Sequence, residues 1–141
     1  MNKPVINIKN LNVDYITDKN PINAVRDVTF EIFSGEIFGL VGESGSGKST
    51  VVQAMMRILP PPAIISKGEV IINNEDILAS SSLDVIGMRW KKISIVMQSA
   101  LNALNPVLSI REQIHDVLKT HKNLIGLDAD ERAKELLSLV E

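Results

Sequence analysis

Apolar and polar residues alternate along two early stretches of the chain, a pattern typical of strands with one buried face. The first stretch covers residues 5–15 and changes phase after Asn10, which predicts a bulge or short turn within an extended segment. The second covers residues 28–32 and ends in a Ser-Gly turn. The polar segment between them, 17–23, is predicted to be a loop. The two stretches therefore predict an antiparallel-looking hairpin.

Further along, the pattern changes from alternation to continuous apolar runs. Residues 36–41 are more continuously apolar, and residues 93–97 have the β-branched content of a buried strand, so both are predicted to be buried strands. Residues 69–72 are predicted to be a short strand. Helices are predicted for 51–59 and 83–92.

Two helix starts are predicted near the end of the sequence. Ser109 followed by Glu112 forms a capping box, in which each side chain bonds the other residue's backbone amide. Asp128 and Glu131 have a similar spacing and predict the start of a second helix. This last pattern continues to Glu141 without a stop signal, so we expect the sequence to end within a helix.

Composition limits the protein class without naming a function. The 141 residues are 45% hydrophobic and 23% charged with a net charge of −2, as expected for one globular domain. Without a basic excess, no nucleic-acid partner is predicted. Without cysteines, disulfides and thiolate metal sites are excluded. We see no signal peptide and no apolar run long enough to cross a bilayer, so any work at a membrane requires docking to a membrane-spanning protein.

The segment Gly42–Thr50 carries the clearest chemistry. Its sequence GESGSGKST lies between a predicted strand and a predicted helix, and it matches the phosphate-loop or Walker A pattern. Glycines let the main chain wrap around a polyphosphate, and the helix that follows adds its N-terminal amides and dipole. The predicted nucleotide contacts of this loop are Gly42, Glu43, Ser44, Gly45, Ser46, Gly47, Lys48, Ser49 and Thr50.

Three residues of the loop have distinct predicted roles. Lys48 is predicted to contact the β- and γ-phosphates of ATP, and the Ser49 hydroxyl is predicted to ligate Mg²⁺. Thr50 is well placed for the α-phosphate. The alternative is a glycine-serine turn that contains a lysine by chance, but the strand before and the helix after match the context that the motif requires.

The residues around the loop resemble a known family. Tyr15 lies on an early strand, Gln98 ends a later strand, and residues 96–110 read VMQSALNALNPVLSI. Together they resemble the nucleotide-binding subunit of an ABC transporter, and the Leu-Asn-Pro-Val segment resembles the dipeptide and oligopeptide importer branch. The resemblance covers residues 5–141. It implies an α/β fold with a P-loop NTPase core of ABC type, and with an antiparallel β subdomain and Walker A core over 1–98.

The same resemblance implies that 98–141 holds the Q-loop and the start of a helical subdomain. It also implies a role for residues outside the phosphate loop. Tyr15 would stack on adenine, and Val25 would touch the base and ribose. Gln98 would be the Q-loop glutamine, which reaches Mg²⁺ and the attacking water and acts in catalysis together with Lys48. The alternatives are an ordinary strand aromatic for Tyr15, a core residue for Val25 and a solvated strand end for Gln98.

Two motifs of the family are absent from the sequence. There is no Leu-Ser-Gly-Gly-Gln-like signature, and no apolar run ends in the Asp-Glu of Walker B; the nearest stretch, 70–76, has an amide in place of the carboxylate. We therefore expect an N-terminal fragment of an importer ATPase that binds ATP and Mg²⁺ without turnover. An unpaired sheet edge also predicts that the fragment self-associates.

The resemblance implies partners for the whole protein. They are a transmembrane permease and a second ATP-binding subunit, which would place the protein in the cytoplasm at the membrane periphery, with peptides or similar solutes as cargo. Two alternatives remain at this point: a non-transport P-loop ATPase or kinase, and a non-catalytic interaction module with a vestigial phosphate loop. The 104–107 segment discriminates against a kinase, which has no reason to carry it.

Overall fold

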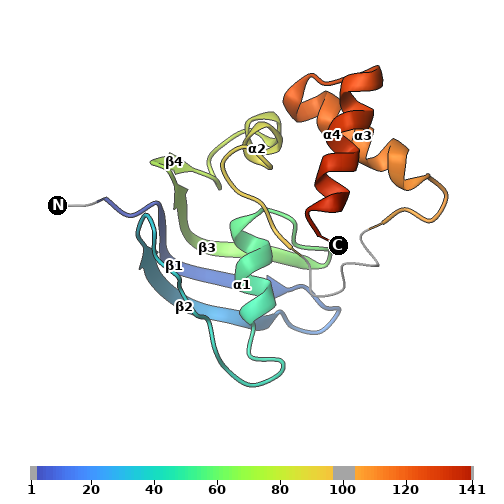
Figure 1. The fold of residues 1–141 in the computed structure, drawn as a ribbon. Helices are drawn as coiled ribbons and strands as arrows, with labels where there is room; N and C mark the ends of the chain where they lie inside the picture. Colours follow the sequence, from blue (N-terminus) through green and yellow to red (C-terminus); the bar gives the residue numbers. More distant parts are fainter. Residues whose placement is uncertain (1–2, 97–103, 141) are drawn as a thin grey trace. The chain divides into compact units, whose positions relative to one another are not determined.

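A computed structural model describes residues 3–96 and 104–140 (Figure 1). The chain divides into two compact units, residues 1–92 and residues 93–141. Among the described residues, the first unit contains a sheet and two helices, and the second contains two helices. Each unit is described by itself below.

The first unit is built on a four-stranded antiparallel sheet. Its strands are β1 (Ile6–Tyr15), β2 (Ile22–Ile32), β3 (Ala63–Ile72) and β4 (Glu75–Asp76), in the spatial order β2-β1-β3-β4. The strands predicted over 5–15, 28–32 and 69–72 are confirmed. β2 and β3 are longer than predicted, because main-chain pairing with β1 continues through residues whose side chains do not alternate.

The predicted irregularity in β1 is a shift of register against β2. The pairing shifts between Ile8 and Leu11, and Asn10 between them has a positive φ of 47°. Asp27 on the facing strand also has a positive φ, 53°, and its Oδ1 accepts a hydrogen bond of 2.7 Å from Asn10 Nδ2. This paired distortion keeps apolar side chains on the buried face on either side of the shift.

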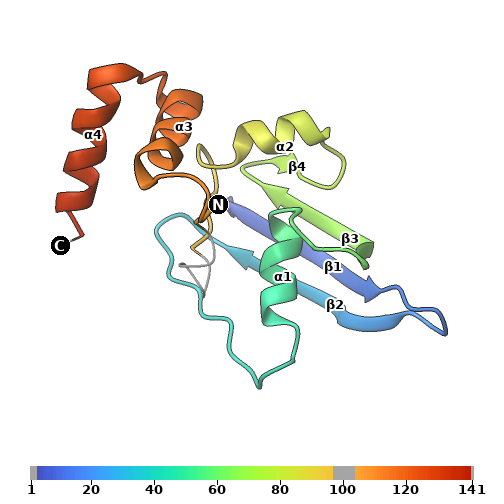
Figure 2. The same ribbon diagram turned by 90° about the vertical axis from the view of Figure 1, so that its right-hand side faces the viewer.

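The core of this unit lies between the sheet and helix α1 (Lys48–Met55), which runs along one face of the sheet (Figure 2). The fully buried strand residues are Ile8, Leu11, Val13 and Val70. From α1, Val51 and Ala54 are buried. The helix predicted over 51–59 therefore exists, but it begins within the phosphate-loop motif and ends before the three prolines.

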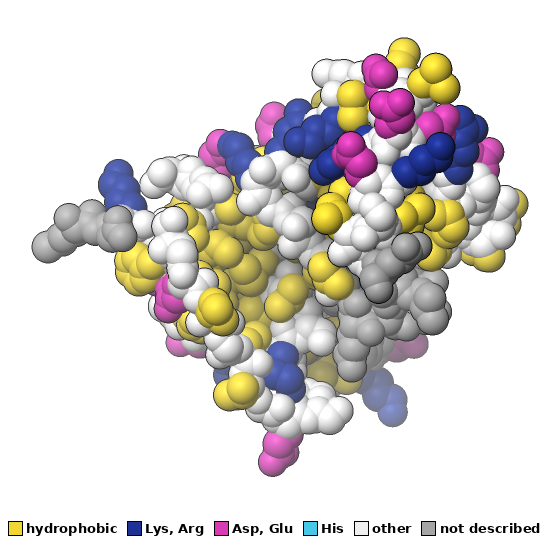
Figure 3. Space-filling model, in the orientation of Figure 1, with side chains coloured by type: hydrophobic (Ala, Val, Ile, Leu, Met, Phe, Trp, Pro, Cys, Tyr) yellow, Lys and Arg dark blue, Asp and Glu magenta, His cyan; other side chains and the backbone are white. Residues whose placement is uncertain are grey.

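The prediction of a buried strand over 36–41 is wrong. This segment belongs to no strand, and the side chains of Ile37 and Val41 are 99% and 91% exposed. An apolar run becomes a buried strand only when neighbouring strands pair with its main chain, and no other described segment does so here. Figure 3 shows hydrophobic side chains at the surface of this part of the molecule.

The second apolar run was also predicted to be a strand. Only Ile93 forms a bridge, residues 94–96 have no regular structure, and Val96 is 90% exposed. Met97 lies outside the described residues. This prediction is therefore wrong for the described part of the run, for the same reason as 36–41.

The remaining helices are α2 (Ser82–Met88), α3 (Ile110–Lys122) and α4 (Gly126–Ser138). The predicted capping box at Ser109 and Glu112 is confirmed. The prediction that Asp128 begins the last helix is wrong: α4 starts two residues earlier and has no side-chain cap. Asn123 ends α3 in the left-handed conformation, and the chain turns back within three residues to begin α4.

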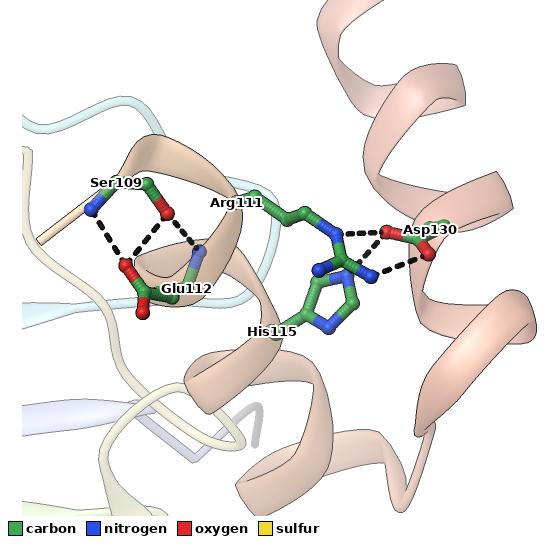
Figure 4. Close-up of polar contacts among 5 residues, drawn as sticks. All are labelled: Ser109, Arg111, Glu112, His115 and Asp130. Carbon is green, nitrogen blue, oxygen red and sulfur yellow. Dashed lines mark hydrogen bonds and ion pairs between the residues drawn. The ribbon is translucent and has the colours of Figure 1, made fainter.

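Helices α3 and α4 are joined by a cluster around Asp130 (Figure 4). Arg111 donates two hydrogen bonds to the Asp130 carboxylate, Nε to Oδ1 at 2.6 Å and Nη2 to Oδ2 at 2.7 Å. Nε2 of His115 lies 2.9 Å from the same Oδ1. The hydrogen bonds from Arg111, followed by its charge and by His115, lower the pKa of Asp130 to about 2. The cluster stabilises the pairing of the two helices.

Candidate functional site

The phosphate-loop motif connects the unpaired segment 36–41 to the first turn of α1. Gly47 is the N-cap residue of this helix and has a left-handed φ of 87°. A Cβ atom at Gly47 would lie 2.6 Å from the backbone oxygen of Ala24 on β2. Both the conformation and the close approach require glycine here. The loop is therefore held against the sheet at the point where the helix begins.

The N-terminus of α1 is open. The first helical hydrogen bond runs from Val51 N to Gly47 O, at 2.9 Å, so the amides of Lys48, Ser49 and Thr50 precede it and have no partner within the helix. No side chain caps this end, and its first turn contains no acidic residue. Three amides and the positive end of the helix dipole thus favour an anion.

The Lys48 side chain folds back over the loop. Its Nζ donates hydrogen bonds to Gly42 O at 2.7 Å, to Glu43 O at 2.5 Å and to Ser46 Oγ at 3.2 Å. Within the described residues the ammonium has no carboxylate partner. Its three neighbours are neutral acceptors, so the positive charge adds to that of the helix end.

A cavity of about 270 Å³ opens at this place. It is lined by Tyr15, Ala24 and residues 45–50. The structure thus brings the end of β1, the start of β2 and most of the phosphate loop around one space. Gly42, Glu43 and Ser44 do not line the cavity; the first two contribute the carbonyl groups that hold Lys48.

Val25 lies in a different environment from Tyr15. Its side chain is only 3% exposed and belongs to the core, and its Cγ2 would lie 3.4 Å from a Cβ at Gly47. The neighbouring Ala24 lines the cavity instead. Sequence reasoning missed Ala24, although strand alternation could have indicated it: when one residue faces the core, the next faces away.

Of the two predicted metal ligands, only Ser49 lies within the described residues. Ser49 is exposed and lines the cavity, which suits a hydroxyl that meets a hard cation beside phosphates. Gln98 lies outside the described residues. Within residues 3–96 and 104–140, no group of three or more acidic or histidine side chains could hold a metal ion. The His115 side chain contacts Asp130 instead, between α3 and α4.

None of the helices in the described part of the chain has the length and hydropathy needed to cross a membrane. The donor set around the cavity consists of backbone amides, one lysine and small hydroxyls, beside one aromatic ring. This set matches a phosphorylated ligand with a flat base, because amides and lysine suit phosphates and a ring offers a stacking face.

Comparison with known proteins agrees with the geometry. Among solved structures, the chain is similar to a bacterial ABC transporter cassette, MJ0796, with a TM-score of 0.77 and 28% identity over 94% of this chain and 54% of that one. Among curated proteins, it is 36% identical over 137 residues to the dipeptide transport ATP-binding protein DppD of Bacillus subtilis. It is 39% identical to a putative peptide import ATP-binding protein of Brucella abortus.

These alignments cover nearly all of this chain, 96% and 97%, but each covers 41% of the relative. The chain thus spans about two fifths of the length of the curated relatives it matches. Residues 25–141 match the family described as ABC transporter. Because this match covers far more than half of the chain and includes the phosphate loop, the chain belongs to the ABC transporter family.

Proposed function

We propose that this chain is the ATP-binding part of an importer ATPase, which couples ATP hydrolysis to the uptake of peptides or similar solutes. The observation that carries the proposal is the uncapped N-terminus of α1, which adjoins Lys48 and opens into a cavity shared with Tyr15. The relatives' names, which describe dipeptide transport and peptide import, support the choice of cargo.

In this proposal each part of the cavity serves one part of ATP. The phosphates lie on the amides at the start of α1, where Lys48 exchanges its loop contacts for phosphate oxygens. Thr50 meets the α-phosphate. The adenine ring lies on Tyr15, and the small Ala24 leaves room beside it. The contact of Val25 with the base and ribose stays a prediction, because its side chain lies in the core and does not line the cavity.

The Ser49 hydroxyl would hold Mg²⁺, with Gln98 as the predicted second ligand. When bound, the ion neutralises charge on the transferred phosphate and aligns it for attack by water. This chain supplies an oxygen ligand and the positive surroundings of the phosphates. Gln98 would further orient the attacking water.

We expect the 141-residue chain to bind ATP without measurable turnover. In P-loop enzymes the Walker B carboxylate supports the metal, and positioning together with electrostatics provides almost all of the catalysis. Neither Walker B nor the signature motif occurs in the sequence. An ATPase rate that depends on Lys48 in the purified chain would contradict this expectation.

The partners follow from the same proposal. A transmembrane permease and a second ATP-binding subunit would complete the importer, with the ATPase at the cytoplasmic surface of the membrane. The exposed apolar segment 36–41 further favours self-association of the isolated chain. Light scattering at micromolar concentration should show a dimer or larger species, and a clean monomer would count against self-association.

One alternative has a specific observation in its favour. Because Lys48 is already held by the loop carbonyls, the loop could be a vestigial element of a non-catalytic interaction module. Membership of the ABC family excludes the kinase alternative but retains an ABC-type ATPase outside transport.

Equilibrium binding of fluorescent ATP, with and without Mg²⁺, separates these functions. The wild-type chain should bind more tightly with Mg²⁺, and Lys48→Ala should lose most of its affinity. Lys67→Ala is a matched control, because Lys67 is exposed on β3 in the same unit. Equal binding by all three proteins, or no binding by the wild type, would contradict the proposed function.

A further inference from the structure

The C-terminal end of α1 has an unusual residue at its turning point. The amide of Arg57 donates to Ala54 O and that of Ile58 donates to Gln53 O, both at 3.0 Å, which is the Schellman pattern of helix termination. In this pattern the turning residue is left-handed and is usually glycine. Here it is Arg57, with a φ of 49°. A long side chain therefore occupies a strained position where glycine would be relaxed.

The Arg57 side chain connects α1 to the turn after β4. Its Nη1 donates to Ile77 O at 3.1 Å and to Ser80 O at 2.7 Å. That turn is itself closed by Asp76, whose backbone oxygen accepts from the Ser80 amide and whose Oδ1 accepts from the Leu78 amide. The arginine thus joins the helix end to a turn closed by its own hydrogen bonds.

A second arginine reaches the same helix end from the end of α2. Nη2 of Arg89 donates to Met56 O at 3.0 Å and to Arg57 O at 3.1 Å. Met56 is the C-cap residue of α1 and Arg57 follows it, so both carbonyl groups lie at the C-terminal end of the helix, where a positive charge complements the helix dipole. Neither arginine has an ion-pair partner within the described residues, so both charges are directed to backbone oxygens.

We propose that Arg57 and Arg89 form a clamp that positions α1 for phosphate binding. They are positioning residues, because they contact neither the cavity nor any predicted phosphate ligand. Helix α1 is only eight residues long, about 12 Å. A tilt of its clamped end therefore moves the amides of Lys48, Ser49 and Thr50 relative to Tyr15. This inference rests on the proposed function.

The clamp residues come from segments that are separate in sequence but belong to one compact unit. Residues 57, 76–80 and 89 all lie within 1–92. The sheet contacts α1 through β1 and β2. The arginines restrain the C-terminal end of the same helix, through their hydrogen bonds to backbone oxygens.

The sharpest test is Arg57→Gly. Glycine suits the left-handed φ and keeps the Schellman hydrogen bonds, so the stability of the chain should stay near that of the wild type, while the contacts to Ile77 and Ser80 are lost. ATP affinity should fall roughly tenfold, as expected when charge-assisted hydrogen bonds that order a site are removed. Unchanged affinity in Arg57→Gly would overturn the clamp.

Arg89→Gln and Arg89→Lys test the contribution of Arg89 to the clamp. Gln removes the charge and should also weaken ATP binding roughly tenfold, and Lys should restore part of the affinity because it still donates to carbonyls. Arg132→Gln is the matched control, since that exposed arginine contacts only Glu135 in the described structure. ATP affinity is measured under conditions in which denaturant unfolding curves show that each protein is folded. A lower unfolding midpoint with unchanged affinity would show a merely structural role and overturn the proposal.

Failure of the clamp can be distinguished from failure of the proposed function. If the wild type bound no ATP, the function would be contradicted, and hydrogen exchange would still test the clamp. Exchange at the amides of Ser49 and Thr50 should accelerate in Arg89→Gln and not in Arg132→Gln. Equal exchange in both variants would overturn the clamp.

Discussion

The N-termini of α1 and α3 differ in how their unpaired backbone amides are treated. At α3, the Ser109 hydroxyl accepts a 3.2 Å hydrogen bond from the Glu112 amide, and the Glu112 carboxylate accepts from the Ser109 amide at 2.8 Å (Figure 4). Hydrogen bonds from Ser109, first from its hydroxyl and then from its amide, lower the pKa of Glu112. At α1, no side chain caps the helix and no acid lies in the first turn.

The difference shows how an incomplete helix end can indicate function. Capping contributes about 1 kcal/mol to the stability of a typical helix. Helix α3 gains this stabilisation from its own residues, because the capping box satisfies the amides of Ser109 and Glu112 within the chain. Helix α1 leaves its amides and dipole available next to Lys48 and a cavity. An anion from outside the chain can complete it, and this is what the proposed function requires.

The largest expected effect is on ATP binding at the uncapped N-terminus of α1. Lys48→Ala removes the cation beside the α1 amides and should weaken ATP binding by about 2 kcal/mol, roughly thirtyfold, because charge-assisted hydrogen bonds are stronger than neutral ones. Isothermal titration of both proteins gives the comparison. A change of less than threefold would mean that the helix end alone binds the phosphates.

The second prediction concerns the close contact between Gly47, at the N-terminus of α1, and the Ala24 carbonyl on β2. Gly47→Ala places a Cβ against the Ala24 carbonyl and forces a left-handed alanine. We expect a loss of about 2 kcal/mol in the free energy of unfolding. Urea denaturation measures it, with Gly87→Ala in α2 as the control, because a Cβ there meets nothing within 4 Å. Equal stability of the two variants would contradict the packing described for Gly47.

The third prediction makes α3 resemble α1. Ser109→Ala removes the cap and should cost about 1 kcal/mol of stability while leaving ATP affinity unchanged. Denaturant unfolding and ATP titration of the same sample measure both quantities. If this variant lost ATP affinity, the two helix ends would not be independent.

The smallest effect concerns the contact between α3 and α4. The pKa of Asp130 is lowered to about 2 from 3.8, so its charged form stabilises the folded state. That contribution is fully present above the unfolded pKa and is lost as the pH falls from about 5 toward about 2. The effect is small, because Arg111 is 65% exposed and solvent screens the pair.

Thermal unfolding across this pH range tests the sign. Asp130→Asn should unfold at a slightly lower temperature than the wild type near neutral pH, and the two melting temperatures should converge as the pH falls. A gap that widens toward low pH would contradict the assigned direction of the pKa shift. Asp116→Asn is a control on α3, since no ion pair is found for Asp116 in the described residues.

The sequence could predict the features that are determined within short segments. The alternation in 5–15, the capping box at Ser109 and the phosphate-loop motif each depend on neighbours within a few residues, and the structure confirms the strand and the cap. The roles of the loop residues and of Tyr15 stay predictions. The structure nevertheless places Tyr15 and residues 45–50 around one cavity.

What the sequence could not predict depends on distant residues. The 36–41 run has the composition of a buried strand, but pairing decides whether a strand forms, and composition does not show pairing. Asp128 and Glu131 have the spacing of a helix start, yet the preceding turn begins α4 earlier. Arg57 and Arg89 carry no local signal, since only the fold brings them to the same helix end.

The most direct test of the open α1 terminus is an amide-resolved titration of the ¹⁵N-labelled chain with MgATP. The amide resonances of Lys48, Ser49 and Thr50 should shift on binding, and those of Ile110, Arg111 and Glu112 at the capped end of α3 should not. If the α1 resonances stayed in place, or if both helix ends shifted equally, the open terminus would not be the nucleotide site.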